Sequence, residues 1–151
     1  MLDIGTGVGV YIPNLPEKNH YTFSDIDLKS LNKARLQAER RFSRARTEFI
    51  HGDAMKTLAA SQSVDLISLI HVISVVPQHE VVIRKAIEKL NPGGELLIYI
   101  SSISKRVPLV LEDKFERLGF RTLRLESMGL DWKIIRVSPL NECYVYKKKI
   151  N

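Results

Sequence analysis

Short apolar runs alternate along the chain with longer stretches in which apolar residues recur every three or four positions. The short runs are typical of buried strands, and the longer stretches are typical of amphipathic helices. Strands are expected at residues 1–4, 21–23, 49–50, 64–70, 95–100 and 120–125. Helices are expected at residues 30–44, 81–90 and 107–118. This alternation indicates βαβ units, and therefore a parallel sheet with helices on both faces.

The C-terminal part of the chain is expected to depart from this pattern. Residues 142–148 follow the strand at residues 120–125 with no helical pattern between them, so we expect the last strand to return antiparallel, as a hairpin partner. The predicted fold is an α/β, doubly wound, Rossmann-like and mostly parallel sheet with an antiparallel last strand. No repeat, linker or low-complexity stretch divides the 151 residues, which predicts a single domain over residues 1–151.

The first predicted strand runs into the sequence D-x-G-x-G-x-G, formed by Asp3, Gly5, Gly7 and Gly9. Glycines permit a tight turn and let the backbone approach a ligand closely, and a helix N-terminus that follows supplies unpaired N–H groups. The dinucleotide fingerprint G-x-G-x-x-G would require a glycine at Val10. A hydride-transfer enzyme that binds NAD is therefore the weaker alternative.

Two carboxylates follow the second predicted strand in the sequence YTFSDIDL. A carboxylate at a strand end can accept hydrogen bonds from both hydroxyls of a ribose. Asp25 keeps the strand-end position, so we assign the ribose contact to it. Asp27 is then expected to be the N-cap of the following helix.

Five segments, taken in order, resemble the motifs of the class I S-adenosylmethionine-dependent methyltransferases. LDIGTGVG resembles the first motif, FSDIDLKSLNKAR the second and FIHGDAMKTL the third. SVDLISLIHVISVVP is similar to the fourth strand and the loop after it, and KLNPGGELLIYI to the helix, PGG turn and fifth strand. The resemblance covers nearly the whole chain. It implies a methyltransferase domain whose cofactor is S-adenosyl-L-methionine.

The resemblance implies that the glycine loop contacts the methionine portion of the cofactor. Gly5 and Gly7 would line it, and Asp3 would hold the loop and reach the ammonium group through backbone or water. Thr6 stands where many relatives have cysteine or another small residue, which is compatible with binding.

Further residues are assigned by the same resemblance to the nucleoside and to the ammonium group. Asp25 would accept from the ribose, and Ile26 would pack on the adenine. Asp53 would accept from the adenine amino group, while the Ala54 N–H would face a ring nitrogen. The backbone near Ile70 would help to hold the ammonium group.

No catalytic residue is assigned. His71 lies next to the expected methyl donor and could accept a proton from a substrate, but a role in shaping the pocket is the favoured interpretation. The other histidines lack metal-ligand spacing, so no metal site is expected. Cys143 is the only cysteine, which excludes an intrachain disulfide.

The predicted function is transfer of a methyl group to a small-molecule acceptor, since ISLIHVISVVP resembles the loop of small-molecule enzymes and an N-P-P-Y motif is absent. RNA methylation and a non-catalytic domain that binds the cofactor or a partner protein remain the alternatives. No apolar run approaches the ~20 residues that span a bilayer, and no signal peptide is evident. A cytoplasmic protein without membrane attachment is therefore expected.

The net charge of +6 suggests a polyanionic partner, depending on where the charge lies. Arg40, Arg41, Arg44 and Arg46 are expected near the far end of the second helix, and residues 147–149 end the last strand, both away from the cofactor. A solvated basic face is therefore favoured over nucleic-acid binding.

Relatives of this family normally carry helices before the first motif, whereas this sequence starts inside the first strand. Either the sequence is therefore that of a truncated form, or cover over the methyl donor is expected from residues 127–141 with Trp132, from a second copy, or from another protein. We expect cofactor binding to persist better than turnover without such cover. Apolar surface beside the short first strand is expected to favour a homodimer.

Overall fold

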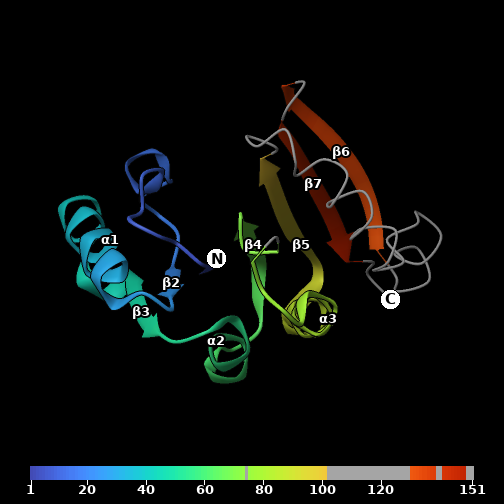
Figure 1. The fold of residues 1–151 in the computed structure, drawn as a ribbon. Helices are drawn as coiled ribbons and strands as arrows, with labels where there is room; N and C mark the ends of the chain where they lie inside the picture. The colour runs from blue at the N-terminus through green and yellow to red at the C-terminus, as the bar shows by residue number, and fades with distance from the viewer. Residues whose placement is uncertain (74, 102–129, 139–140, 149–151) are drawn as a thin grey trace.

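The computed structural model of the chain describes residues 1–73, 75–101, 130–138 and 141–148 (Figure 1). Seven strands in this part of the chain form one sheet with the order β3-β2-β1-β4-β5-β7-β6. The strands are β1 (Leu2–Ile4), β2 (Tyr21–Asp25), β3 (Thr47–His51), β4 (Val64–Ile70), β5 (Leu90–Ser101), β6 (Leu130–Ser138) and β7 (Asn141–Lys148). The helices are α1 (Leu28–Arg41), α2 (Ala54–Ala60) and α3 (His79–Lys89), with 3-10 turns η1 (Ile12–Asn14) and η2 (Arg44–Arg46).

Strands β1 to β5 pair in parallel, with Asp3 opposite Phe23 of β2 and Ser68 of β4. This arrangement confirms the predicted Rossmann-like α/β fold with a parallel sheet. Strand β7 pairs antiparallel with β5 and with β6. The strand expected at residues 120–125 and the helix expected at residues 107–118 lie outside the described residues, so both stay predictions.

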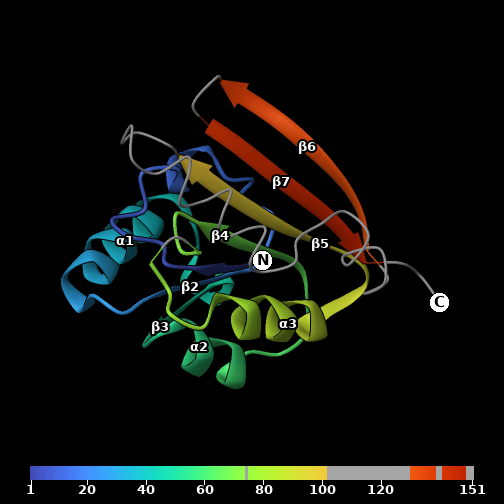
Figure 2. The same cartoon turned by 45° about the vertical axis from the view of Figure 1, so that its right-hand side comes forward.

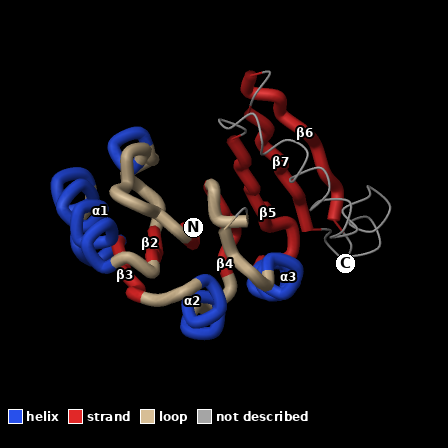
Figure 3. The backbone as a smooth tube through the Cα atoms, in the orientation of Figure 1, coloured by secondary structure: helices blue, strands red, loops and turns tan. Residues whose placement is uncertain are grey.

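The two faces of the sheet bury separate apolar clusters because successive side chains of a strand point to opposite sides. Leu2 and Ile4 belong to the cluster that includes residues of α2 and α3, which lie side by side (Figure 2). Phe23 belongs to the other cluster, which includes Leu31 and Ala34 of α1. Helices therefore cover both faces, as the alternating pattern predicts (Figure 3).

Helix α1 begins where its sequence supplies a cap. The Asp27 carboxylate accepts hydrogen bonds from the Lys29 and Ser30 backbone N–H groups at 3.1 and 3.2 Å. Asp27 is thus the N-cap, as predicted, and this cap satisfies backbone donors that have no partner inside the helix. Arg40 and Arg41 in the last turn lie at the negative end of the helix dipole.

Residues 130–138 correct one prediction. They were expected in a loop over the active face, but they form β6, the strand at the opposite edge of the sheet from β3. The segment LDWKIIRVS carries Asp131, Lys133 and Arg136, and charged residues are common on edge strands. Trp132 is opposite Tyr146 of β7 in the register, so its backbone belongs to the sheet and not to a loop over the glycine turn.

Strand β1 itself is fully buried, because Leu2 and Ile4 are only 0% and 2% exposed. Large exposed apolar side chains lie in the loops that follow β1 and β2, Val8, Val10 and Ile26, and at the start of α1, Leu28. In the described part of the chain, no helix combines the length and apolar composition needed to span a bilayer.

Candidate functional site

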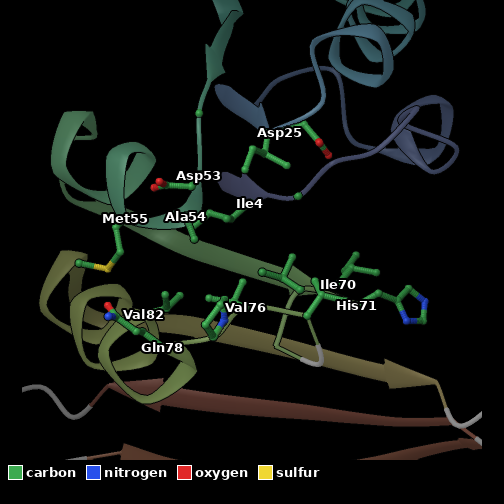
Figure 4. Close-up of a pocket in the computed structure, with 16 residues that line it drawn as sticks. Ile4, Asp25, Asp53, Ala54, Met55, Ile70, His71, Val76, Gln78 and Val82 are labelled. Carbon is green, nitrogen blue, oxygen red and sulfur yellow. The ribbon is translucent and has the colours of Figure 1, made fainter. Parts of the chain in front are cut away.

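A cavity of about 530 Å³ opens where β1, β2 and β4 end (Figure 4). In parallel α/β sheets, ligands bind at these carboxyl ends of the strands. The cavity is lined by Ile4, Gly5, Asp25, Ile26, Gly52, Asp53, Ala54, Met55, Ile70, His71, Val72, Val75, Val76, Pro77, Gln78 and Val82. Most of these side chains are apolar. The charged ones, Asp25 and Asp53, are both acidic, and no lysine or arginine is among the lining residues in the described part of the chain.

The structure brings six of the nine predicted site residues together around this cavity. They are Gly5, Asp25, Ile26, Asp53, Ala54 and Ile70. The other three, Asp3, Thr6 and Gly7, belong to the glycine loop but do not line the cavity. Asp3 and Thr6 are buried beneath the loop, with exposed fractions of 1% and 5%.

The glycine loop is fixed to β2 and requires glycine at its first turn. The Gly5 and Thr6 N–H groups donate to the Ser24 carbonyl at 2.9 and 2.8 Å. Gly5 has φ +74°, and a Cβ atom there would lie 2.4 Å from Cγ2 of Val72. Any larger residue at this position would therefore be strained and would collide with the loop after β4.

Asp25 joins the glycine loop to the end of β2. Its Oδ2 atom accepts a hydrogen bond from the Gly7 N–H at 2.7 Å, and its Oδ1 atom accepts from the Asp27 N–H at 2.8 Å. A carboxylate offers about four lone-pair positions, so each oxygen can accept a further bond from a ligand. The carboxylate is thereby oriented at the wall of the cavity (Figure 4).

Asp53 and Ala54 stand at the start of α2, which the sequence pattern had not predicted as a helix. Asp53 is its N-cap, and its Oδ1 atom accepts from the Lys56 N–H at 2.7 Å. Ala54 is the first helical residue, and backbone N–H groups in the first turn have no partner inside the helix. The cavity wall thus offers both an acceptor and donors next to Ile26, whose side chain is 71% exposed.

Asp3 is the centre of a buried polar network under the loop. The Tyr11 hydroxyl donates to its Oδ2 atom, and the Ser68 hydroxyl donates to its Oδ1 atom. The Tyr11 hydroxyl also lies 3.0 Å from the Thr6 hydroxyl. Burial raises the pKa of the Asp3 carboxyl, although the hydrogen bonds from Ser68, Thr6 and Tyr11 oppose this shift. The geometry ties Asp3 to the loop through Tyr11.

This buried carboxyl predicts a pH dependence of stability. The folded protein holds the Asp3 proton more tightly than the unfolded chain, whose pKa is near the ordinary 3.8, so the free energy of unfolding should fall as the pH rises from about 4 toward the raised value. The slope is at most about 1.4 kcal/mol per pH unit. Urea unfolding of the wild type and Asp3→Asn between pH 4 and 8 measures it. We expect the free energy of unfolding of the Asp3→Asn variant to lack this contribution to the pH dependence. Parallel pH profiles for the two proteins would refute the prediction.

His71 adopts an unusual backbone conformation at the end of β4. Its φ is +59°, the left-handed region that residues other than glycine seldom occupy. Its N–H donates to the Tyr99 carbonyl at 2.9 Å, and its ring meets the Tyr99 ring edge-on with centroids 5.0 Å apart. In Figure 4 the imidazole lies at the end of the lining group away from Met55. The structure thus places an exposed histidine at the rim of the cavity.

Several lining residues were missed by the sequence analysis. Val72, Val75, Val76 and Gln78 form the wall after β4, and Met55 lies on α2. The apolar run VISVVP is the sequence feature that could have identified the wall after β4. Among the residues described, no three His, Cys, Asp or Glu side chains are close enough to hold a metal ion.

A glycine loop and a strand-end carboxylate that meet in one crevice are typical of Rossmann-like α/β proteins that bind nucleotides. The model of the methyltransferase domain family matches residues 2–98, more than half of the chain. The chain belongs to this family, which confirms the predicted S-adenosyl-L-methionine-dependent methyltransferase domain and its cofactor. No curated protein sequence matches the chain.

Solved structures with the same fold include three methyltransferases. A methyltransferase from Pyrococcus furiosus is 20% identical, with a TM-score of 0.67 over 99% of this chain and 74% of that chain. The N-methyltransferase NodS from Bradyrhizobium japonicum, in complex with S-adenosyl-L-homocysteine, is 17% identical, with a TM-score of 0.72 over 97% and 76%. Magnesium protoporphyrin IX methyltransferase from Synechocystis, with the same ligand bound, is 15% identical, with a TM-score of 0.70 over 98% and 73%. The chain spans about half of two other similar structures, 50% and 48%.

Proposed function

We propose that the cavity binds S-adenosyl-L-methionine and that the domain transfers its methyl group to a small-molecule acceptor. The observation that best supports this proposal is the pair of acidic acceptors on the cavity wall. In the described part of the chain, the charged lining residues are Asp25 and Asp53. Two such acceptors suit the hydroxyl and amino donors of an adenosine, and NAD is disfavoured because the fingerprint G-x-G-x-x-G would require a glycine at Val10. The volume of about 530 Å³ also falls in the range of small-molecule sites, about 300–1,000 Å³.

The nucleoside half of the ligand fits the wall between β2 and α2. Asp25 would accept from the ribose hydroxyls with the lone pairs that the Gly7 and Asp27 N–H groups leave. Ile26, which is exposed beside it, would pack on the adenine. Asp53 and the Ala54 N–H would meet the polar edge of the base.

The methionine half fits the glycine loop. Gly5 and Gly7 would lie beside it, and a Cβ atom at Gly7 would have no heavy atom within 4 Å. Thr6 and Asp3 would hold the loop from beneath through Tyr11. The backbone around Ile70 would complete the contact with the ammonium group.

The bound cofactor supplies a methyl group that its positive sulfur already activates. The protein therefore has to orient an acceptor and exclude water, and positioning can supply most of the catalysis. His71 at the rim would shape the acceptor pocket; as a base, it would be needed only for an acceptor that arrives protonated.

The small-molecule acceptor is supported by the apolar wall after β4, Val72, Val75 and Val76, which suits an organic molecule better than a polyanion. One structural neighbour is named for magnesium protoporphyrin IX as its substrate. RNA methylation and cofactor binding without transfer are the competing functions.

We further propose a cytoplasmic domain that self-associates. Val10 and Val75 are each more than 70% exposed around the loop and the cavity, and such side chains favour contact with a second surface. Cover of this kind would also raise turnover, since an open cavity admits water.

A transfer assay with methyl-labelled cofactor tests the proposal. The purified chain is incubated with a small-metabolite pool and, separately, with total RNA. We expect label in the metabolite fraction, and calorimetry should show micromolar-scale binding of S-adenosyl-L-homocysteine. Label only in RNA would overturn the acceptor class. Binding without any transfer would favour the non-catalytic alternative, and binding of NAD alone would refute the cofactor assignment.

A further inference from the structure

The net positive charge of the chain is concentrated in one segment, residues 28–46. This segment contains seven of the 23 lysines and arginines but only one of the 17 acidic residues. The rest of the chain therefore holds sixteen residues of each sign and is neutral as a whole. The net charge of the whole chain, +6, is therefore the net charge of residues 28–46, which comprise α1, η2 and the two residues between them.

Packing directs these charges outward. Helix α1 buries Leu31, Ala34 and Ala38 against the sheet, so the opposite side of the helix faces solvent. Figures 1 and 3 show α1 at the margin of the molecule, beside β2 and β3. Lys29, Lys33 and Arg40 lie on that solvent side at a spacing of four and seven residues, which places them in one row. At 1.5 Å per residue the row is about 16 Å long, and exposed Arg44 follows it in η2.

Three other arginines of the segment have structural partners. Arg41 forms an ion pair with Glu17 at 2.7 Å, and Arg46 donates to the Glu17 carbonyl at 3.2 Å. The Arg35 guanidinium lies 4.9 Å from the centre of the Phe49 ring. These contacts give three of the seven charges a structural role. Arg41 and Arg46 hold the loop before β2, and Arg35 packs on a side chain of β3.

The remaining side chains lack such a role. Lys33, Arg40 and Arg44 are exposed, and within the described ranges none of them forms an ion pair or a side-chain hydrogen bond. Like charges in one row repel one another, so the row does not stabilise the fold, and its exposed cations are accessible to an anionic partner.

We propose that this row, Lys33, Arg40 and Arg44 with Lys29, binds the phosphate backbone of single-stranded RNA without sequence preference. A polynucleotide carries a phosphate at every nucleotide, so a row of cations about 16 Å long can meet several phosphates at once. The sole aromatic residue of the segment, Phe42, is buried, so bases have no ring to stack on. The contact is therefore electrostatic.

An anionic membrane is the competing partner, but the helix is poorly suited to it. Membrane-surface helices insert an apolar face, and α1 has already buried its apolar face in the core. Leu28 and Leu36 are its large apolar residues that remain exposed. The RNA-binding surface also lies on side chains that take no part in lining the cavity, so it does not depend on the identity of the methyl acceptor.

Fluorescence anisotropy with a labelled 20-nucleotide oligouridine tests this surface on the full chain. The test variant is Lys33→Gln with Arg40→Gln. The matched control is Lys85→Gln with Arg84→Gln, which also removes one lysine and one arginine from exposed positions of a helix. We expect the test variant to raise Kd about fivefold or more at 50 mM salt and to reduce the slope of log K against log salt by about 1.4, or about 0.7 for each lost contact.

Three outcomes would overturn the proposal. The first is equal weakening by both double variants, which would mean that only net charge matters. The second is no measurable binding of the oligouridine by the wild type at 50 mM salt. The third is tighter binding to phosphatidylserine vesicles than to the RNA, which would favour the membrane. Unchanged affinity of both variants for S-adenosyl-L-homocysteine shows that they are folded and separates this result from that of the cofactor proposal.

Discussion

Replacing Asp25 with alanine should weaken the binding of S-adenosyl-L-homocysteine by about 1.5–3 kcal/mol, or roughly 10- to 150-fold. The substitution removes the acceptor proposed for the ribose hydroxyls. It also releases the Gly7 N–H, which donates to Asp25 Oδ2 at 2.7 Å, and so loosens the loop that meets the methionine half. Isothermal titration calorimetry of the wild type and the variant at one salt concentration measures the difference.

Asp27→Ala provides the matched control, because it removes a carboxylate only two positions away. Asp27 caps α1 through the Lys29 and Ser30 N–H groups, so its loss should lower the free energy of unfolding by about 1 kcal/mol. Its affinity for the ligand should stay close to that of the wild type. If both variants lost affinity equally, the effect would come from α1 and not from a ribose contact. Equal affinity of Asp25→Ala and the wild type would rule out the ribose assignment.

The parallel part of the sheet could be predicted because its signals are local. The apolar run at β4 and the glycines after β1 each lie within about ten residues, and the acid at Asp25 directly ends a strand. Such short-range patterns carry the strand and turn preferences of the chain. Because parallel strands end at the same edge, the sequence also predicts that Asp25 and Gly5 share one site.

The polar network beneath the loop could not be predicted in this way. Ser68 reaches Asp3 from 65 positions along the chain, and this contact depends on the pairing of β1 with β4. Tyr11 contributes as the N-cap of the short 3-10 turn η1, outside every strand and helix that the sequence pattern predicts. The left-handed backbone of His71 likewise occurs together with contacts to Tyr99, a residue of another strand, and local sequence does not reveal it.

Strand β6 and helix α2 could not be predicted from the sequence for a different reason. Two adjacent isoleucines, Ile134 and Ile135, interrupt the alternation of β6, so its period of two was not evident. Helix α2 spans seven residues, which is too short to display a full amphipathic repeat. The capping acid Asp53 was its clearest signal, but the family resemblance favoured a contact with the cofactor over a cap at that residue.

Gly9→Ala should lower the free energy of unfolding by about 2–4 kcal/mol, since it combines two penalties. Gly9 has φ +73°, and a side chain in the left-handed region costs about 1–2 kcal/mol. The new Cβ atom would also lie 2.5 Å from Ile12 Cδ1 and 3.0 Å from the Ala34 Cβ atom. Ile12 and Ala34 are both 0% exposed, so neither has room to move, and overpacking of this kind costs about 1–3 kcal/mol.

Gly7→Ala separates these two penalties. Gly7 has φ +56°, but a Cβ atom there would meet no heavy atom within 4 Å, so only the conformational penalty of about 1–2 kcal/mol remains. Urea unfolding followed by far-ultraviolet circular dichroism gives both free energies, provided that the m values agree. A larger loss for Gly9→Ala would mean that the glycine loop is packed directly on η1 and α1, because the two variants share the backbone strain and differ in the contacts with Ile12 and Ala34. Equal losses would show that the close packing of Gly9 against Ile12 and Ala34 adds nothing to the stability of the fold.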